Sequence, residues 1–170
     1  MSTWNIDPAH SEVGFKVKHL MINNVKGQFK KFEGTVESEK DDFKDAKITF
    51  KAEAASIDTA SEQRDGHLKS PDFFDVEKFP EIKFISESFD GEKLKGALTI
   101  LGISKSVQLN VEFGGIAKDP WGNTKAGFTL SGKINRKDWG LNWNAALETG
   151  GFLVSEDVNI IAEIQLIKQA

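Results

Sequence analysis

The side chains able to do acid–base or metal chemistry are few and scattered along this chain. The three histidines, His10, His19 and His67, lack the spacing of a metal site such as H-E-x-x-H. Cysteine is absent, which excludes a disulfide framework, a thiolate nucleophile and a cysteine metal site. No G-x-S-x-G sequence marks a hydrolase nucleophile. We therefore predict no catalytic residue, metal site or cofactor.

The densest group of polar side chains is the sequence QRDGHLK, which contains one of only two arginines in the chain, Arg64. Two interpretations stay open. Arg64, His67 and Lys69 would face an anionic head group at the mouth of the barrel. Alternatively, Arg64 would pair with Asp65 or Glu62 on the surface of a helix.

This group lies in a segment whose spacing is typical of a short helix rather than a strand. Asp58 or Thr59 is predicted to cap the helix, and Glu62 follows Thr59 at the spacing of a capping box. Pro71 would end the helix, and two adjacent phenylalanines, Phe73 and Phe74, follow it.

Apolar and polar residues alternate through most of the remaining chain, which is the pattern of strands with one buried face. In the second of these segments the phase slips between Phe29 and Phe32, which predicts a β-bulge. Eight segments show the alternation: residues 11–20, 25–36, 46–54, 81–88, 93–100, 106–113, 125–134 and 157–167.

Short turn sequences join several of these segments. FDGEK at 89–93 contains Asp-Gly, and KDPWGN at 118–123 has Pro and Gly at turn positions. A sheet of eight strands, each with one solvent-exposed and one buried face, leaves no free strand edge when it closes into a barrel. The sequence thus predicts an all-β, eight-stranded antiparallel up-and-down barrel, with the helical insert between strands three and four. We expect a single domain over residues 1–170.

The amino-acid composition limits the classes of binding partner. The chain has a formal net charge of −4 and scattered lysines, which argues against nucleic acid. The first residues lack the pattern of a signal peptide, and no apolar run is long enough to span a bilayer. We expect a cytoplasmic protein without stable membrane insertion.

The aromatic residues are thirteen Phe and four Trp, with no Tyr. An eight-stranded barrel can be filled by its side chains or can hold one small ligand, and the alternation itself leaves both open. Two inserts that carry aromatic residues favour a cavity, because a solid barrel needs no apolar lid. These are the helical insert and residues 135–156, which include Trp139, Leu141 and Trp143.

Several stretches, taken together, resemble the YceI-like polyisoprenoid-binding family. They are WNIDPAHSEVGFKVKHL (4–20), VKGQF (25–29), FEG (32–34), SIDTASEQRDGHLKSPDFFD (56–75), KFPEIKF (78–84), GALTILGISKSVQL (96–109) and RKDWGLNWN (136–144). The resemblance covers essentially the whole chain. It implies a lipocalin-like barrel with an elongated hydrophobic pore that holds a long isoprenoid or similar amphiphile, commonly in homodimers. It implies no agreed enzymatic activity.

The leading hypothesis is a non-enzymatic protein that binds a polyisoprenoid or quinone-like lipid for carriage, storage or sequestration. Two alternatives are an enzyme that uses His19 or His67 on the bound lipid, and a filled barrel that serves as an interaction module. The predicted ligand-binding residues come from the inner face and the two inserts: Phe15, Val17, His19, Phe29, Phe50, Arg64, His67, Phe73, Phe74, Phe84, Leu98, Phe128, Trp139 and Trp143.

Overall fold

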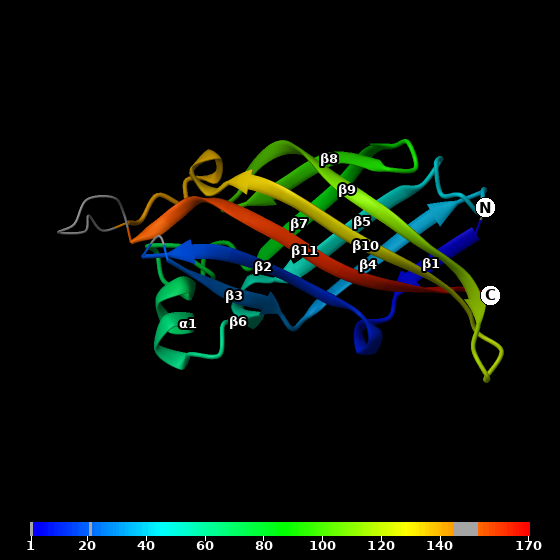
Figure 1. Cartoon of the computed structure of the whole chain (residues 1–170), viewed down its shortest axis with the longest axis horizontal. Coiled ribbons are helices and arrows are strands. Elements are labelled where there is room, and N and C mark those ends of the chain that lie inside the picture. The colour runs from blue at the N-terminus through cyan, green and yellow to red at the C-terminus, as the bar shows by residue number, and fades with distance from the viewer. Residues whose placement is uncertain (1, 21, 145–152) are drawn as a thin grey trace.

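The protein is an elongated antiparallel barrel (Figure 1) in a computed structural model that describes residues 2–20, 22–144 and 153–170. Its strands are β1 (Ser2–Ile6), β2 (Glu12–His19), β3 (Asn23–Phe29), β4 (Phe32–Ser38), β5 (Lys47–Glu53), β6 (Ile57–Asp58), β7 (Glu81–Phe89), β8 (Lys93–Ile100), β9 (Ile103–Lys118), β10 (Thr124–Asn135) and β11 (Val154–Lys168). The helical segments are α1 (Glu62–Lys69) and the 3₁₀ turns η1 (Pro8–His10), η2 (Ala54–Ser56) and η3 (Arg136–Trp139).

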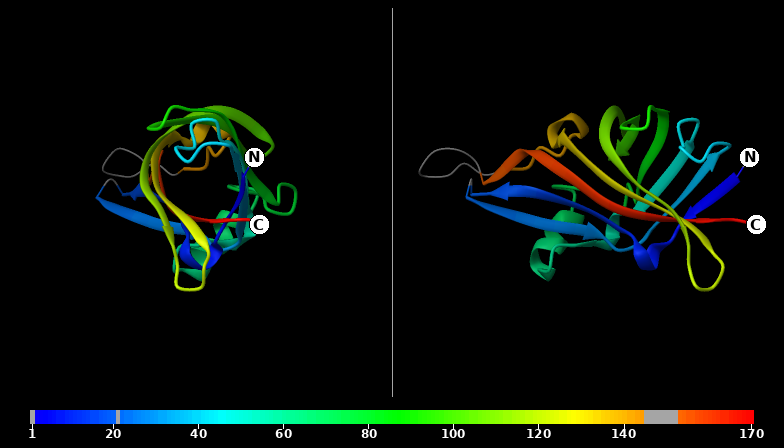
Figure 2. Two further views of the ribbon diagram at one scale, coloured as in Figure 1. Left: turned by 90° about the vertical axis from the view of Figure 1, so that its right-hand side faces the viewer. Right: turned by 45° about the vertical axis from the view of Figure 1, so that its right-hand side comes forward.

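The barrel closes through its first and last strands. β1 pairs with β4 on one edge and with β11 on the other, and the remaining neighbours follow in the order β4-β5-β7-β8-β9-β10-β11. Eight strands thus form a closed antiparallel ring, and the end-on view in Figure 2 shows them encircling one axis. This confirms the predicted fold.

Two wall positions of the barrel are shared by pairs of consecutive strands. β11 pairs with β2 along residues 154–163 and with β1 along residues 166–168, so β1 and β2 lie end to end. β3 and β4 also lie end to end. The break between them falls at residues 30–31, where the sequence predicted a bulge. The strand β1 was missed by the prediction, although Trp4 is buried and Asn5 is exposed in the expected alternation.

Small residues beside phenyl rings explain how the inner face accommodates so many phenylalanines. A Cβ atom on Gly96 would lie 2.4 Å from Cζ of Phe84, and one on Gly27 would lie 2.4 Å from Cζ of Phe15. Contacts this short are not tolerated, so each glycine provides the space that the neighbouring ring occupies.

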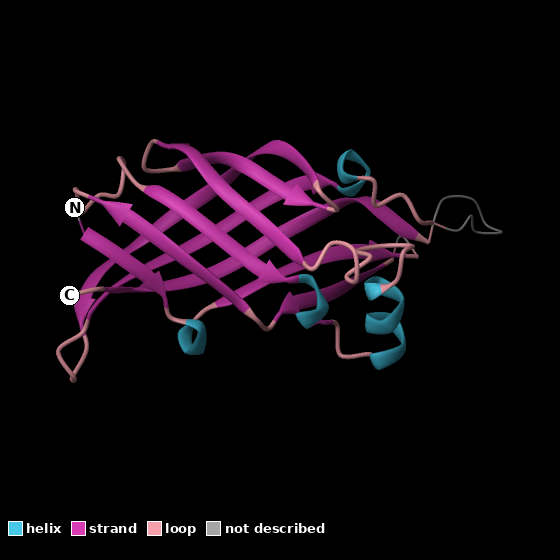
Figure 3. Ribbon diagram, turned by 180° about the vertical axis from the view of Figure 1, so that it is seen from behind, coloured by secondary structure: helices cyan, strands magenta, loops and turns pink. Residues whose placement is uncertain are grey.

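The helical insert lies outside the strands, at the end of the barrel away from both termini (Figures 1 and 3). The N-cap of α1 is Ser61, whose Oγ accepts a hydrogen bond from the backbone N–H of Arg64 at 3.3 Å, and not Asp58 or Thr59 as predicted. α1 has no buried residue, so it is not seated on the barrel by a strongly apolar face. Phe73 after the helix is buried instead. None of the described helices is long and apolar enough to cross a bilayer.

Candidate functional site

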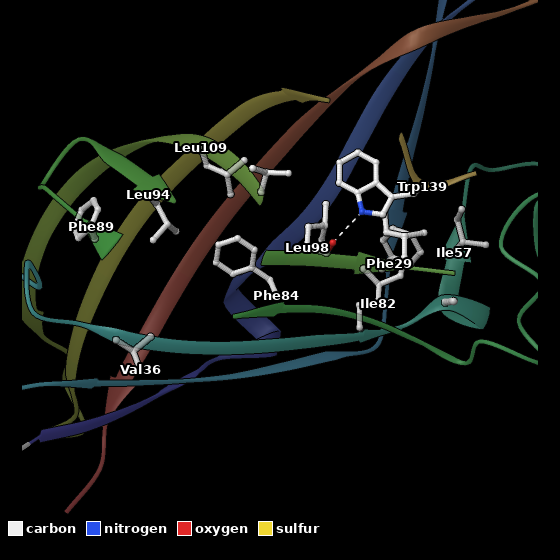
Figure 4. Packing of buried hydrophobic residues seen from close by; sticks show 14 of the residues in the cluster. Phe29, Val36, Ile57, Ile82, Phe84, Phe89, Leu94, Leu98, Leu109 and Trp139 are labelled. Carbon is white, nitrogen blue, oxygen red and sulfur yellow. Dashed lines mark hydrogen bonds between the residues drawn. The ribbon is translucent and has the colours of Figure 1, made fainter. Parts of the chain in front are cut away.

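A cavity of about 720 Å³ runs through the barrel interior and is lined mainly by Phe, Leu, Ile and Val side chains. Phe84, Leu94 and Leu109 point into this interior from β7, β8 and β9 (Figure 4). The volume falls within the range of ligand-binding pockets, roughly 300–1,000 Å³. The alternative of a barrel filled by its own side chains is therefore wrong.

Phe43 lines the end of the cavity that lies near the two chain termini. Phe43 is 2% exposed, and its ring lies 5.2 Å from that of Trp4, 5.7 Å from that of Phe113 and 5.1 Å from that of Phe128. These edge-on contacts bring together rings from β1, β9, β10 and the β4–β5 loop. We refer to Trp4, Phe43, Phe113 and Phe128 as the closed end of the barrel.

The backbone around Phe43 is held in an uncommon conformation by a polar loop. Phe43 has a φ of +61°, which costs energy for a bulky residue. The carboxylate of Asp45 accepts hydrogen bonds from Ser38 Oγ at 2.6 Å and from the backbone N–H of Glu39 at 2.8 Å. These two hydrogen bonds hold the pKa of Asp45 below its usual value, and the bond from the Ser38 hydroxyl contributes more than the bond from the N–H of Glu39. These bonds stabilise the loop that places the ring in the barrel.

The ionisable lining residues gather at the opposite end of the cavity. The ionisable lining side chains are His19, Arg64, His67 and Arg136, and no Asp, Glu or Lys is among the described lining residues. Together with Thr59, these four residues define the polar end of the barrel. An apolar cavity with a few polar groups at one end suits an amphiphile that has a polar head and a long tail.

Arg64 lies at the polar end, without a carboxylate partner among the described residues. Its Nε donates to Thr59 Oγ1 at 2.8 Å, and its Nη2 donates to the carbonyl oxygen of Thr59 at 2.6 Å. No ion pair within 4.0 Å links Arg64 to Asp65 or Glu62, so that interpretation is wrong. Asp65 instead accepts hydrogen bonds from the backbone N–H and the hydroxyl of Thr59, at 2.9 and 2.5 Å.

Arg136 is a second cation at the polar end, and it is only 4% exposed. It donates to the carbonyl oxygens of Ser155 at 2.8 Å, Trp143 at 2.9 Å and Val154 at 3.3 Å, and also to that of Leu141. Burial lowers the pKa of Arg136, and the nearby charge of Glu156 opposes that shift. The guanidinium therefore joins residues 141–143 to the start of β11.

Aromatic rings from both inserts meet at the polar end. The His67 ring lies 4.7 Å from that of Trp143 and 5.1 Å from that of Phe73, both edge-on. Its Nε2 lies 2.9 Å from Oδ2 of Asp72. The Phe74 ring contacts that of Phe29 on β3, 5.9 Å away. The structure thus brings the two predicted lids to the same end of the cavity.

Thirteen of the fourteen predicted ligand-binding residues line the cavity: Phe15, Val17, His19, Phe29, Phe50, Arg64, His67, Phe73, Phe74, Phe84, Leu98, Phe128 and Trp143. Trp139 does not. Its indole N–H donates to the carbonyl oxygen of Leu98 at 2.8 Å (Figure 4), and its ring is buried outside the cavity lining. Pairing that N–H makes Trp139 a structural residue.

The prediction missed Phe43 and Arg136 as site residues. Phe43 lies in an irregular loop, where alternation carries no information about direction. Arg136 follows the seventh predicted strand, and its being one of only two arginines was the sole signal. His10, the remaining histidine, has its Nδ1 2.7 Å from Oδ2 of Asp7, away from the cavity lining.

Comparison with known proteins agrees with this architecture. The family model described as YceI-like domain matches residues 4–166. A UPF0312 protein of Staphylococcus aureus is 42% identical over 166 residues, which is 97% of each chain. The crystal structure of a Campylobacter jejuni YceI protein superposes with a TM-score of 0.74 at 35% identity and covers 96% of both chains.

Two more distant solved structures share the fold. Burkholderia cenocepacia BcnA has a TM-score of 0.77 at 22% identity and covers 94% of this chain and 98% of its own. A polyisoprenoid binding domain from Saccharophagus degradans has a TM-score of 0.68 at 13% identity and covers 98% of both chains. With the barrel, its cavity and these matches in agreement, the chain belongs to the YceI-like family.

Proposed function

We propose that this protein binds one polyisoprenoid or similar long-chain lipid inside the barrel, for carriage, storage or sequestration. The observation that carries the proposal is the apolar cavity of about 720 Å³, whose ionisable lining side chains, among the described residues, lie at one end only. The structural likeness to a domain described as polyisoprenoid-binding supports it.

Burial of the tail supplies the affinity. A tail of about twenty carbons would gain roughly 16 kcal/mol on leaving water, at about 0.8 kcal/mol for each CH₂ group. Association and ordering of the ligand cost on the order of 4–15 kcal/mol. The balance allows tight but reversible binding, which suits a carrier better than permanent attachment.

The two ends of the cavity set the direction of the ligand. The tail would extend toward Phe43, because the rings of the closed end offer no polar partner inside the cavity. The head group would lie at the polar end, where the guanidinium of Arg64 and the ring of His67 are within reach. Arg64 has donor capacity beyond its two bonds to Thr59.

Native mass spectrometry and titration with an isoprenoid such as geranylgeraniol test the proposal. Leu130 lines the cavity from β10, whereas Thr129 beside it does not and bonds Glu163 at 2.9 Å. We expect L130W to occupy the cavity and abolish uptake, and T129W to bind like the parent protein. Absence of both a co-purifying lipid and titratable uptake in the parent protein would reject the proposal. Undiminished uptake by L130W would place the ligand elsewhere.

One observation favours a second candidate, an enzyme that acts on the bound lipid. His67 lines the cavity and is oriented by Asp72 at 2.9 Å, an arrangement that suits a general base better than that of His19. The matched variants H67A and H19A separate the candidates. A chemically altered lipid that disappears in H67A alone, with binding retained, would establish the enzyme.

A further inference from the structure

The turn between β2 and β3 exposes two aliphatic side chains at the polar end of the barrel. Ile22 is 78% exposed and Leu20 is 40% exposed. The backbone N–H of Leu20 donates to the carbonyl oxygen of Leu153, a cavity-lining residue, at 2.8 Å. The apolar tip, formed by Leu20 and Ile22, is therefore anchored beside the cavity.

The strand that leads away from this tip has an open edge. β3 pairs with β2 along residues 23–28, but on its other edge only Gln28 and Phe29 pair with β6. Among the strand pairings of the described residues, residues 23–27 have no second neighbour. Val25 in this stretch lines the cavity, and so do Val17 and His19 on β2. The barrel wall thus has an unpaired strand edge next to the apolar tip.

The strands that lead to and from the tip are basic in a protein that is acidic as a whole. Residues 13–32 contain five lysines and no Asp or Glu, against a net charge of −4 for the chain. Lys30 pairs with Asp58 at 2.9 Å. Lys16, Lys18 and Lys26 have no carboxylate within ion-pair distance among the described residues, and Lys18 and Lys26 are exposed.

We propose that the apolar tip and the lysines of β2 and β3 dock on the surface of an anionic lipid bilayer. Aliphatic side chains at an exposed tip, flanked by lysines, combine the two forces that hold proteins at such a surface. Docking would set the open edge of β3 against the membrane, so that a lipid could pass between bilayer and cavity without crossing water. This role in exchange rests on the proposed function, whereas docking itself does not.

Sedimentation with vesicles tests docking. One set of vesicles is phosphatidylcholine, and the other is an equal mixture of phosphatidylcholine and phosphatidylglycerol. We expect the protein to bind the mixed vesicles at least about tenfold more tightly. I22D should lower that affinity about tenfold or more, because it places a charge where an aliphatic group would be buried.

Matched variants at other exposed sites serve as controls. Trp121 is 84% exposed in the β9–β10 turn at the opposite end of the barrel, so W121D should bind vesicles like the parent protein. K18Q should lower the affinity for mixed vesicles roughly fivefold, because each lysine near an anionic surface contributes about 1 kcal/mol to binding. K95Q, an equal charge change at an exposed site on β8, should leave it unchanged.

Three results would overturn docking: no binding to mixed vesicles, a loss in W121D that equals the loss in I22D, or loss of a homodimer in I22D with vesicle binding intact. The last result, read by light scattering, would assign the tip to a second copy of the chain. Isoprenoid uptake from solution should be the same in I22D and the parent protein. If uptake fails in the parent protein, the proposed function falls while the vesicle result stands.

Discussion

The closed end and the polar end of the barrel solve the same problem, closure of an apolar tube, by different means. At the closed end, rings from distant parts of the chain pack edge to face around Phe43. At the polar end, Arg136 donates hydrogen bonds to four carbonyl oxygens and so joins residues 141–143 to the start of β11. The side chain of Arg64 is exposed there. Ring packing closes one end with apolar contacts alone, whereas polar groups at a mouth can exchange hydrogen-bond partners with water or a ligand.

Removal of the central ring at the closed end should have the largest effect on stability. F43A is expected to lower the free energy of unfolding by about 3–5 kcal/mol, because it leaves a cavity among three rings and keeps the unfavourable backbone conformation. Urea denaturation measures the loss. F113A is the matched control: Phe113 is 37% exposed, so its loss should be smaller. A larger loss in F113A would show that Phe43 is not the centre of the floor.

The same variant should lengthen the cavity. With the ring of Phe43 removed, the tail of a bound lipid gains room beyond its present limit. Titration with isoprenols of increasing chain length should therefore move the optimum in F43A to longer chains than in the parent protein. An unchanged optimum would place the floor of the binding site elsewhere.

Loss of the buried cation at the polar end should cost less. R136M keeps much of the side-chain volume and removes a desolvated charge, but it leaves buried carbonyl oxygens without donors. We expect the free energy of unfolding to fall by about 2–3 kcal/mol. The neighbouring Lys137 pairs with Glu156 at 2.9 Å on the surface, so K137M should cost less than about 1 kcal/mol. Equal losses would contradict the bridging role of Arg136.

Arg64 should affect binding and not folding. R64Q removes an exposed guanidinium and is expected to change stability by less than about 0.5 kcal/mol. It should weaken binding of a lipid that carries a carboxylate or phosphate head about tenfold, and leave the alcohol of the same chain length unaffected. Lys69 on the same helix does not line the cavity, so K69Q is the control. An equal effect on both head groups would remove Arg64 from the site.

Acid should weaken the loop of the closed end. The pKa of Asp45 in the folded protein lies below 3.8 because Ser38 and the N–H of Glu39 bond its charged form. Its contribution to stability is complete above its pKa in the unfolded chain and is lost as the pH falls through the lower folded value. D45N should remove this part of the acid dependence, as measured by thermal unfolding at several pH values. The same acid dependence in D45N would assign it to other carboxyl groups.

Prediction from sequence succeeded where a side chain's direction follows from its neighbours. In a strand, alternate residues face opposite sides, so Phe15, Phe50 and Phe84 could be assigned to the interior without coordinates. The assignment of Trp139 to the cavity lining failed because this residue lies in η3. There the 3₁₀ turn directs its indole N–H to the carbonyl oxygen of Leu98. The prediction also missed the first strand, β1, because its five residues contain too few alternations to stand out as a pattern.

The sequence by itself determined a barrel with an apolar interior and a charged exterior. This follows because apolar and polar residues alternate in eight successive segments. Only the tertiary structure decided that the tube is hollow and which end is closed. Whether side chains fill a barrel depends on the sum of their volumes across all the facing strands, which no single segment contains. The closure depends on Phe43, a loop residue that meets Trp4, Phe113 and Phe128 only after the chain has folded.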